Sequence, residues 1–293
     1  LNIPRIMLPK PVPSSGIVGN SVKEIFGGEI PIAGMAGDQQ AALFGETCFK
    51  MGECKSTFGT GNFLLLNTGE KPLISKNGLL TTIAWGINDK VYYALEGSVF
   101  VCGAAVQWLR DGLDFMKASP ESEEMAMSVN SCGGVYVVPA FAGLGAPYWE
   151  ADARGAIFGI TRGTTKNHIT RATLESLAYQ NQDLISAMSA DLGISIEELK
   201  VDGGASENDF LMQFQADISR MNIIRHKQTE STSLGAAYLA GLATGYYESM
   251  EEIIKNSEID KTFSPYMSIE DRDERLKGWH DAVHATIRLA KKS

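Results

Sequence analysis

The sequence predicts an α/β fold, and two features carry that prediction. Short apolar runs alternate with segments whose apolar residues recur every three or four positions, which is typical of strands interleaved with helices. After Gly52, turn residues separate strand-like runs, which predicts a meander of paired strands at 53–58, 62–67, 79–86 and 90–96. Helices are expected at 103–112, 119–128, 167–191, 207–220, 232–244 and 270–290.

The beginning of the chain is predicted to be less regular. Residues through Gly28 are rich in Pro, Ser and Gly and are expected to form an extended connector without a core of its own. The apolar segment 30–36 predicts a buried strand, and a helix is expected over 38–46. An acidic residue, Asp38, therefore lies where a strand gives way to a helix.

The longest predicted helix has a clear apolar face. Its buried side is expected to carry residues spaced by three, four or seven positions, namely Leu174, Ala178, Ile185, Met188 and Leu192. Gly193 follows directly and predicts an ordinary C-terminal stop for this helix.

Composition limits the classes of function. Of the 293 residues, 44% are hydrophobic and 21% are charged, with no apolar run of 18 residues that could span a bilayer. The net charge of -9 disfavours sequence-independent binding of nucleic acid, because such binding needs clustered Lys and Arg. The N-terminus does not resemble a signal peptide, so a cytoplasmic location is expected. The four cysteines are then expected to be reduced and structural.

The first glycine-containing turn lies at 56–63 (STFGTGNF), between two predicted strands. Gly59 and Gly61 would let the backbone approach a ligand and direct amide groups at an anion, and Thr60 would add a hydroxyl donor for a phosphate oxygen. A plain hairpin turn explains the same residues equally well.

The second turn lies at 199–208 (LKVDGGASEN), where a short strand ends in two glycines before a helix. This is the crevice position at which α/β proteins bind nucleotides. Gly203 and Gly204 would let an adenosine lie on the backbone, and Asn208 would reach it from the first turn of the helix. Glycine at a strand-to-helix turn is also common without any ligand.

A third stretch at 143–149 (GLGAPYW) opens like a dinucleotide fingerprint. Tyr148 stands where the last glycine belongs, next to Pro147, so a Rossmann oxidoreductase is unsupported.

Asp38 is the best candidate for a catalytic base, because a carboxylate after a tight glycine at the end of a buried strand can be held dry and directed at a hydroxyl. The alternative is that Asp38 caps the following helix. Gln39 offers an amide that can donate to and accept from a polyol hydroxyl. His280 and His284 lack acidic or Cys partners for a metal, so a Mg²⁺ would arrive with a nucleotide and use carboxylates such as Asp38.

Several motifs together resemble the glycerol kinases of the FGGY family of carbohydrate kinases. Residues 34–45 (GMAGDQQAALFG) resemble the segment that holds the catalytic aspartate. Residues 155–160 (GAIFGI), followed by His168-Ile169 and by 172–175 (ATLE), are similar to the second signature of the family. Within the family, glycerol kinases are indicated by 67–71 (NTGEK), 77–82 (NGLLTT) and 145–149 (GAPYW).

The resemblance implies an actin-like ATPase fold with two ribonuclease-H-like lobes, a mixed sheet flanked by helices, and ATP with Mg²⁺ in the cleft between the lobes. It implies that 1–46 end the first lobe and that 47–293 form the nucleotide-binding second lobe. Asp38 would deprotonate the attacking glycerol hydroxyl, while Gln39 and Phe63 would bind glycerol. The implied nucleotide contacts are Thr60, Gly103, Gln107, Gly204 and Asn208.

The resemblance also implies that the first phosphate loop and the rest of the glycerol pocket lie in an N-terminal lobe that this chain lacks. The chain is therefore expected to be a weak kinase alone, and a homo-oligomer is expected. Two alternatives stay open. One is an FGGY kinase for another sugar or polyol, and the other is a nucleotide-binding module without catalysis.

Overall fold

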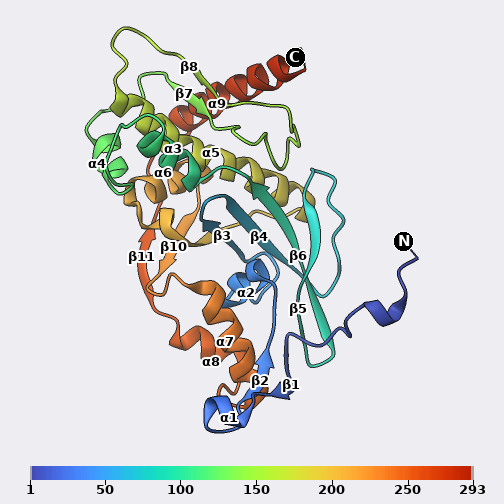
Figure 1. The fold of residues 1–293 in the computed structure, drawn as a ribbon. Coiled ribbons are helices and arrows are strands. Elements are labelled where there is room, and N and C mark those ends of the chain that lie inside the picture. Colours follow the sequence, from blue (N-terminus) through green and yellow to red (C-terminus); the bar gives the residue numbers. More distant parts are fainter. Residues whose placement is uncertain (1, 292–293) are drawn as a thin grey trace.

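A seven-stranded mixed sheet forms the centre of the computed structural model, which describes residues 2–291 (Figure 1). The strands lie in the order β11-β10-β9-β3-β4-β6-β5, with β9 parallel to both of its neighbours and the other pairs antiparallel. Their bounds are β3 (Cys54–Phe58), β4 (Asn62–Gly69), β5 (Leu80–Ile87), β6 (Lys90–Val99), β9 (Glu198–Asp202), β10 (Asn222–His226) and β11 (Ile259–Phe263). The predicted α/β class and the four strands are confirmed, but the predicted meander is wrong. Strand β4 pairs with β6, and β5 lies at the edge of the sheet beyond β6. The connection 70–79 is too long for a tight hairpin, so β5 does not have to lie next to β4.

The predicted helices also form, with ends that differ by one or two residues from expectation. They are α2 (Asp38–Gly45), α3 (Gly103–Asp111), α4 (Glu121–Met127), α5 (Lys166–Leu192), α6 (Asp209–Ser219), α7 (Ser231–Thr244) and α9 (Ile269–Ala290). Helix α5 ends at Gly193, whose φ of 74° is the left-handed stop expected there. Four of the five residues predicted for its apolar face are buried, and Leu192 is half-buried.

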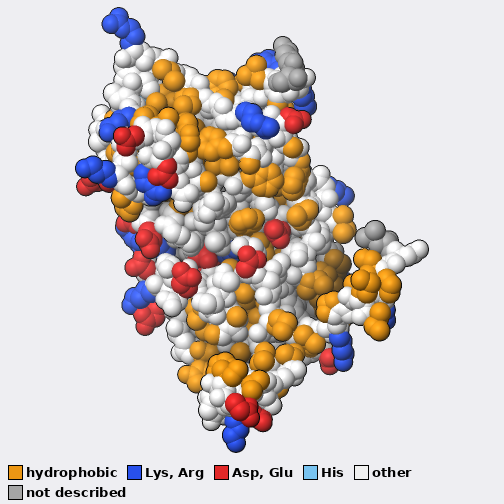
Figure 2. All heavy atoms as spheres, viewed as in Figure 1, with side chains coloured by type: hydrophobic (Ala, Val, Ile, Leu, Met, Phe, Trp, Pro, Cys, Tyr) orange, Lys and Arg blue, Asp and Glu red, His pale blue; other side chains and the backbone are white. Residues whose placement is uncertain are grey.

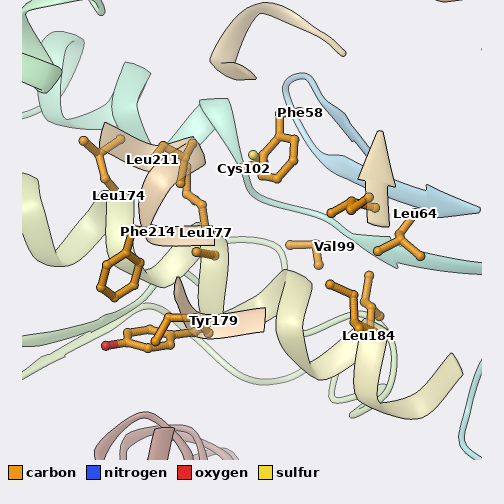
Figure 3. Packing of buried hydrophobic residues seen from close by; sticks show 14 of the residues in the cluster. Phe58, Leu64, Val99, Cys102, Leu174, Leu177, Tyr179, Leu184, Leu211 and Phe214 are labelled. Atoms are coloured by element: carbon orange, nitrogen blue, oxygen red, sulfur yellow. The ribbon is translucent and has the colours of Figure 1, made fainter. Parts of the chain in front are cut away.

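Helices cover both faces of the sheet. On one face, α3, α5 and α6 pack over the largest apolar cluster (Figure 3). Among its members are Phe58, Leu64 and Val99 from the sheet and Leu174, Leu177, Leu184 and Leu211 from the helices. On the other face, α2, α7 and the short helix α8 (Met250–Asn256) enclose a second cluster that includes Phe44 and Trp85, whose rings meet edge to face at 5.1 Å.

Helices α2 and α7 touch through their backbones. A Cβ atom placed on Gly235 would collide with the carbonyl oxygen of Ala41, and one placed on Gly45 would collide with that of Ser231. Only glycine permits this approach, so α2 lies in direct contact with α7 along its length.

The N-terminal part differs from expectation. Instead of an extended connector, it forms β1 (Ser15–Asn20) and the short helix α1 (Lys23–Phe26), and β1 pairs with β2 (Pro31–Gly34) in a separate two-stranded sheet. No described residue before β2 is buried, which confirms that this part has no core of its own. Its apolar side chains gather on the surface around the N-terminal segment and the tip that carries α1 (Figure 2).

The prediction of a buried strand at 30–36 is wrong. Strand β2 covers four residues, of which only Ala33 is buried. The physical reason is that β2 packs one face on α7 and belongs to a two-stranded sheet, so its other face stays exposed.

The sequence did not indicate α8, β10, β11, β7 (Tyr136–Val138) or β8 (Ala156–Phe158). The four cysteines are buried and free, as expected. Across the described part of the chain, no helix combines the length and apolar character needed to cross a membrane.

Candidate active site

A cavity of about 530 Å³ opens where the β3–β4 hairpin meets α3, α4, α6 and the 3-10 turn Gly204–Glu207. Three segments far apart in the sequence contribute the residues that were predicted to contact nucleotide. All five of these residues line the cavity: Thr60, Gly103, Gln107, Gly204 and Asn208. The structure thus brings the two predicted glycine turns together at one site.

Backbone contacts hold the hairpin turn against the start of α3. The amide of Cys102 donates to the Thr60 carbonyl and the amide of Gly103 to the Gly59 carbonyl, both at 2.9 Å. A Cβ atom on Gly103 would lie 2.7 Å from the Gly59 carbonyl oxygen, so this approach needs glycine. The first amides of α3 are therefore used within the protein, and the turn itself faces the cavity.

The second turn holds its shape through one glycine and leaves room at the next. Gly203 has a φ of 85°, and a Cβ there would lie 2.8 Å from the Phe58 backbone. A Cβ on Gly204 would meet nothing within 4 Å, because this residue faces the cavity. Asn208 caps α6 by accepting from the Leu211 amide at 2.9 Å. Its side chain therefore lies at the cavity wall in one defined orientation.

The walls of the cavity are mostly uncharged. Glu123 and Glu207 are the ionisable residues among those that line it, with neither Lys nor Arg in the described lining. A phosphate there would depend on backbone amides, on the Thr60 hydroxyl and on a cation. Sequence reasoning missed the apolar and hydroxyl wall formed by Val106, Ser119, Pro120, Ser122, Leu174 and Leu211. The position of these residues beside the cavity depends on tertiary contacts between separate helices, so no local signal could have revealed this wall.

Asp38 begins α2, but its environment differs from expectation. It is exposed rather than held dry, because β2 before it is exposed. Gly37 occupies the cap position, so the alternative that Asp38 caps the helix is also wrong. The Asp38 Oδ1 atom accepts a hydrogen bond from the Gln39 amide at 2.8 Å. The carboxylate is accessible from solvent in this chain, and it could receive a proton from a bound hydroxyl.

The two residues predicted to bind the acceptor are joined by a lysine that sequence reasoning missed. Lys55 on β3 is fully buried, and its ammonium group donates to the Gln39 Oε1 atom. It also donates to the Thr57 hydroxyl at 2.6 Å and to the Phe63 carbonyl at 3.3 Å. Burial lowers the pKa of Lys55 to about 8, against the opposing effect of the buried Asp202 carboxylate.

Lys55 belongs to a line of polar side chains between the sheet and α2, which we call the polar seam (Glu46, Lys55, Lys200, Asp202, His226 and Ser231). His226, which the sequence left without a partner, lies 2.6 Å from the Glu46 carboxylate. Burial raises the pKa of Glu46, and the hydrogen bond with His226 opposes that shift. Lys200 donates to the Glu46 carbonyl at 2.8 Å, and Ser231 donates to Asp202.

Within the described residues, no group of three or more His, Cys, Asp or Glu side chains could hold a metal ion. His280 hydrogen-bonds Asp183 at 2.9 Å instead of forming a metal pair with His284. A nucleotide-borne Mg²⁺ needs only one or two carboxylates and keeps several waters. The exposed carboxylate of Asp38 fits that limited requirement.

The third glycine stretch is a structural loop. The Tyr148 hydroxyl donates to Asp183 at 2.9 Å, and the Trp149 indole donates to the Gly78 carbonyl at 2.6 Å. Residues 143–149 do not connect a strand to a helix, which agrees with the rejection of a dinucleotide fingerprint.

The chain is similar to known proteins in both sequence and fold. The profile of the FGGY family of carbohydrate kinases, C-terminal domain, matches residues 54–244. Glycerol kinase 1 of Clostridium tetani is 60% identical over 99% of this chain, and glycerol kinase 2 of Thermotoga maritima is 59% identical over 98%. The chain spans 58% of the length of each of these relatives.

Solved structures show the same architecture. The structure of Plasmodium falciparum glycerol kinase with ADP matches with a TM-score of 0.87 and 38% identity, covering 94% of this chain and 55% of that one. The gluconate kinase of Lactobacillus acidophilus matches with a TM-score of 0.81 at 22% identity, over 98% of this chain and 58% of that one. The expected actin-like ATPase lobe is confirmed.

Proposed function

Since the chain belongs to the FGGY family of carbohydrate kinases, we propose that it is the nucleotide-binding, C-terminal portion of an ATP-dependent glycerol kinase. The observation that carries this proposal is that all five predicted nucleotide residues line one and the same cavity. In this proposal, residues 1–46 end the first lobe and 47–293 form the second. The separate sheet of β1 and β2 supports a division after β2, whereas α2 packs with α7 on the seven-stranded sheet.

The proposed reaction transfers the γ-phosphoryl group of ATP to a glycerol hydroxyl, which breaks the bond between the γ-phosphorus and the bridging oxygen and yields glycerol 3-phosphate and ADP. Asp38 takes the hydroxyl proton, Gln39 and Phe63 bind glycerol, and Thr60 donates to a phosphate oxygen. Mg²⁺, when bound with the nucleotide, neutralises phosphate charge. Phosphoryl transfer requires mainly positioning and charge stabilisation, and these groups supply both.

The exposure of Asp38 is consistent with an incomplete site. A base in a phosphoryl-transfer site is normally shielded from water, whereas here β2 and the start of α2 are exposed. We propose that the portion of the kinase beyond this chain covers Asp38 and supplies the first phosphate loop. The proposal includes a cytoplasmic homo-oligomer, and the four free, buried cysteines are compatible with a reducing compartment.

Calorimetric titration of Mg-ADP into this chain tests the nucleotide half of the proposal directly. Saturable one-to-one binding is expected, and its absence would contradict the nucleotide site as placed here. The acceptor is tested in the full-length enzyme with glycerol, xylulose, gluconate and erythritol under the same conditions. Preference for any acceptor other than glycerol would assign the chain to another FGGY kinase.

The non-catalytic alternative makes a different prediction. A nucleotide-binding module would bind Mg-ADP with this chain yet give no phosphoryl transfer in the full-length protein with any acceptor. The high identity to proteins named glycerol kinase favours the catalytic proposal.

A further inference from the structure

The ammonium group of Lys55 is the point at which the two proposed acceptor-binding residues meet. It contacts the side chain of Gln39 from α2 and the backbone of Phe63 from β4. Because Lys55 and Thr57 alternate with residues that face α5, their side chains lie on the α2 side of the sheet. One buried cation therefore connects the start of α2 to the β3–β4 hairpin.

The chemistry of this contact fixes the orientation of the Gln39 amide. An ammonium group has three donors and no acceptor, so only the Oε1 atom of Gln39 can face it. The Nε2 group of Gln39 must then point away from Lys55. It is available to donate, and an acceptor hydroxyl oxygen would receive that hydrogen bond.

We propose that Lys55 is a positioning residue of the acceptor site, and that it makes Gln39 a hydrogen-bond donor toward the substrate hydroxyl. This inference rests on the proposed function, because it assumes that Gln39 and Phe63 contact the acceptor. Nearby contacts agree with it. The Gln40 amide donates to the Thr82 hydroxyl at 3.3 Å, so the first turn of α2 is held by two different strands.

The first test compares two lysines in the full-length enzyme. In Lys55→Met, which keeps an unbranched stem as far as Cε but removes the ammonium group, the KM for glycerol is expected to rise about tenfold or more, while the KM for Mg-ATP stays near the wild-type value. Lys200→Met is the matched control, because Lys200 lies beside Lys55 but, among the described residues, its ammonium group donates to Glu46 and Thr47 and not to Gln39 or Phe63. It is expected to lower thermal stability without raising the KM for glycerol.

A second variant isolates the orientation of the amide. Gln39→Glu keeps an oxygen toward Lys55 but has no donor for the substrate, so the KM for glycerol is expected to rise although the fold is intact. Combining Lys55→Met with Gln39→Met is expected to raise the KM no further than either change alone. A normal KM in folded Lys55→Met or in Gln39→Glu, or additive effects in the double variant, would overturn the inference.

Hydrogen exchange in this chain provides a readout that needs no substrate. Lys55→Met is expected to speed amide exchange at both 38–42 and 57–63, whereas Lys200→Met is expected to speed it near 46–48. If the wild-type enzyme phosphorylates no glycerol, the proposed function fails, and exchange still tests the connection made by Lys55. Unchanged exchange at both segments in Lys55→Met contradicts the connection whatever the acceptor is.

Discussion

Lys55 and Lys200 are register partners on the parallel strands β3 and β9, and their ammonium groups bind opposite ends of helix α2. Lys55 holds the first turn through Gln39, and Lys200 binds the carbonyls of Glu46 and Thr47 beyond the last turn. A cation at a helix C-terminus interacts favourably with the helix dipole. The helix that carries the proposed base is thus held at both ends by side chains from neighbouring strands.

The first prediction concerns the pH dependence of stability. The pKa of Lys55 is about 8 in the folded chain and 10.5 in the reference state, so the unfolded chain binds more protons between these values. The contribution of Lys55 to stability is therefore present above pH 10.5 and is lost as the pH falls through 8. As the pH rises from 8 to 10.5, the free energy of unfolding of the wild type is expected to increase relative to that of Lys55→Met, by at most about 3 kcal/mol.

Urea unfolding at a series of pH values checks this prediction. The acidic groups that favour charged Lys55 are Asp202 on β9, Glu96 on β6 and Glu46 after α2, with the Cys48 thiol also nearby. Taking the difference between wild type and variant removes the titration of other groups. A difference that is flat or that falls with rising pH would contradict the assignment.

A second prediction concerns the cavity. Gly204→Leu is expected to leave the fold intact, because no atom lies within 4 Å of a Cβ there, and to block the nucleotide by filling the cavity. Mg-ADP affinity should fall at least about tenfold by calorimetry. Gly28→Leu is the control, since Gly28 also has open space around it but does not line the cavity. Equal affinity for both variants would place the nucleotide elsewhere.

Asp38→Asn provides the third prediction. In the full-length enzyme, kcat is expected to fall by roughly 10²–10⁴-fold, as when a general base is lost. Asp152→Asn, which changes another exposed aspartate in a loop, serves as the control and should keep normal turnover. Single-turnover kinetics with Mg-ATP and glycerol measure the effect, and near-normal turnover in Asp38→Asn would exclude it as the base.

The fourth prediction concerns the cysteine thiols. Burial raises the pKa of Cys54 and of Cys102 to about 12 and that of Cys132 to about 11, and it also raises the pKa of Cys48. Because the thiolate is the reactive form, a thiol reagent such as Ellman's reagent should label the native chain very slowly at pH 8. In denaturant, all four should react within the mixing time. Rapid labelling of the native chain would show that a cysteine is accessible.

The fifth prediction concerns the buried Asp183 carboxylate of α5. It accepts hydrogen bonds from the Tyr148 hydroxyl at 2.9 Å and from the Trp279 indole at 2.8 Å. Asp183→Ala would leave the buried Trp279 indole and the half-buried Tyr148 hydroxyl without this acceptor, so the free energy of unfolding is expected to fall by about 3–5 kcal/mol. Asp183→Asn, which retains an acceptor oxygen, should cost clearly less. If urea unfolding shows equal losses of stability for the two variants, then the hydrogen bonds to this carboxylate do not account for the loss.

The helices and the strands from β3 to β6 could be predicted from sequence because their patterns are local, whereas the order of the strands in the sheet could not. Helix α5 shows an apolar period over many turns and ends at a glycine, and the strands from β3 to β6 are separated by turn residues. Strands β10 and β11 have five residues each, as β3 does, but no glycine turn flanks them to mark where they begin or end. The exposure of β2 could not be predicted, because it depends on what packs against its second face.

The residues of the candidate site also fall into those that could be predicted from local sequence and those that could not. The glycine turns were visible because backbone geometry demands glycine at Gly103 and Gly203. The polar seam was not, because a charged residue such as Lys55 or His226 in a strand usually faces solvent. These side chains are buried because helix α2 packs over this part of the sheet, a tertiary contact that the sequence of the strands does not reveal.

The glycine contacts between α2 and α7 join two parts of the candidate site. Because the two helices meet backbone to backbone at Gly45 and Gly235, they pack as one unit, and Asp38 is the first residue of α2. Ser231, the first residue of α7, hydrogen-bonds Asp202, which directly precedes the Gly203–Gly204 turn. A continuous path of contacts therefore runs from that turn through α7 to the helix that carries Asp38.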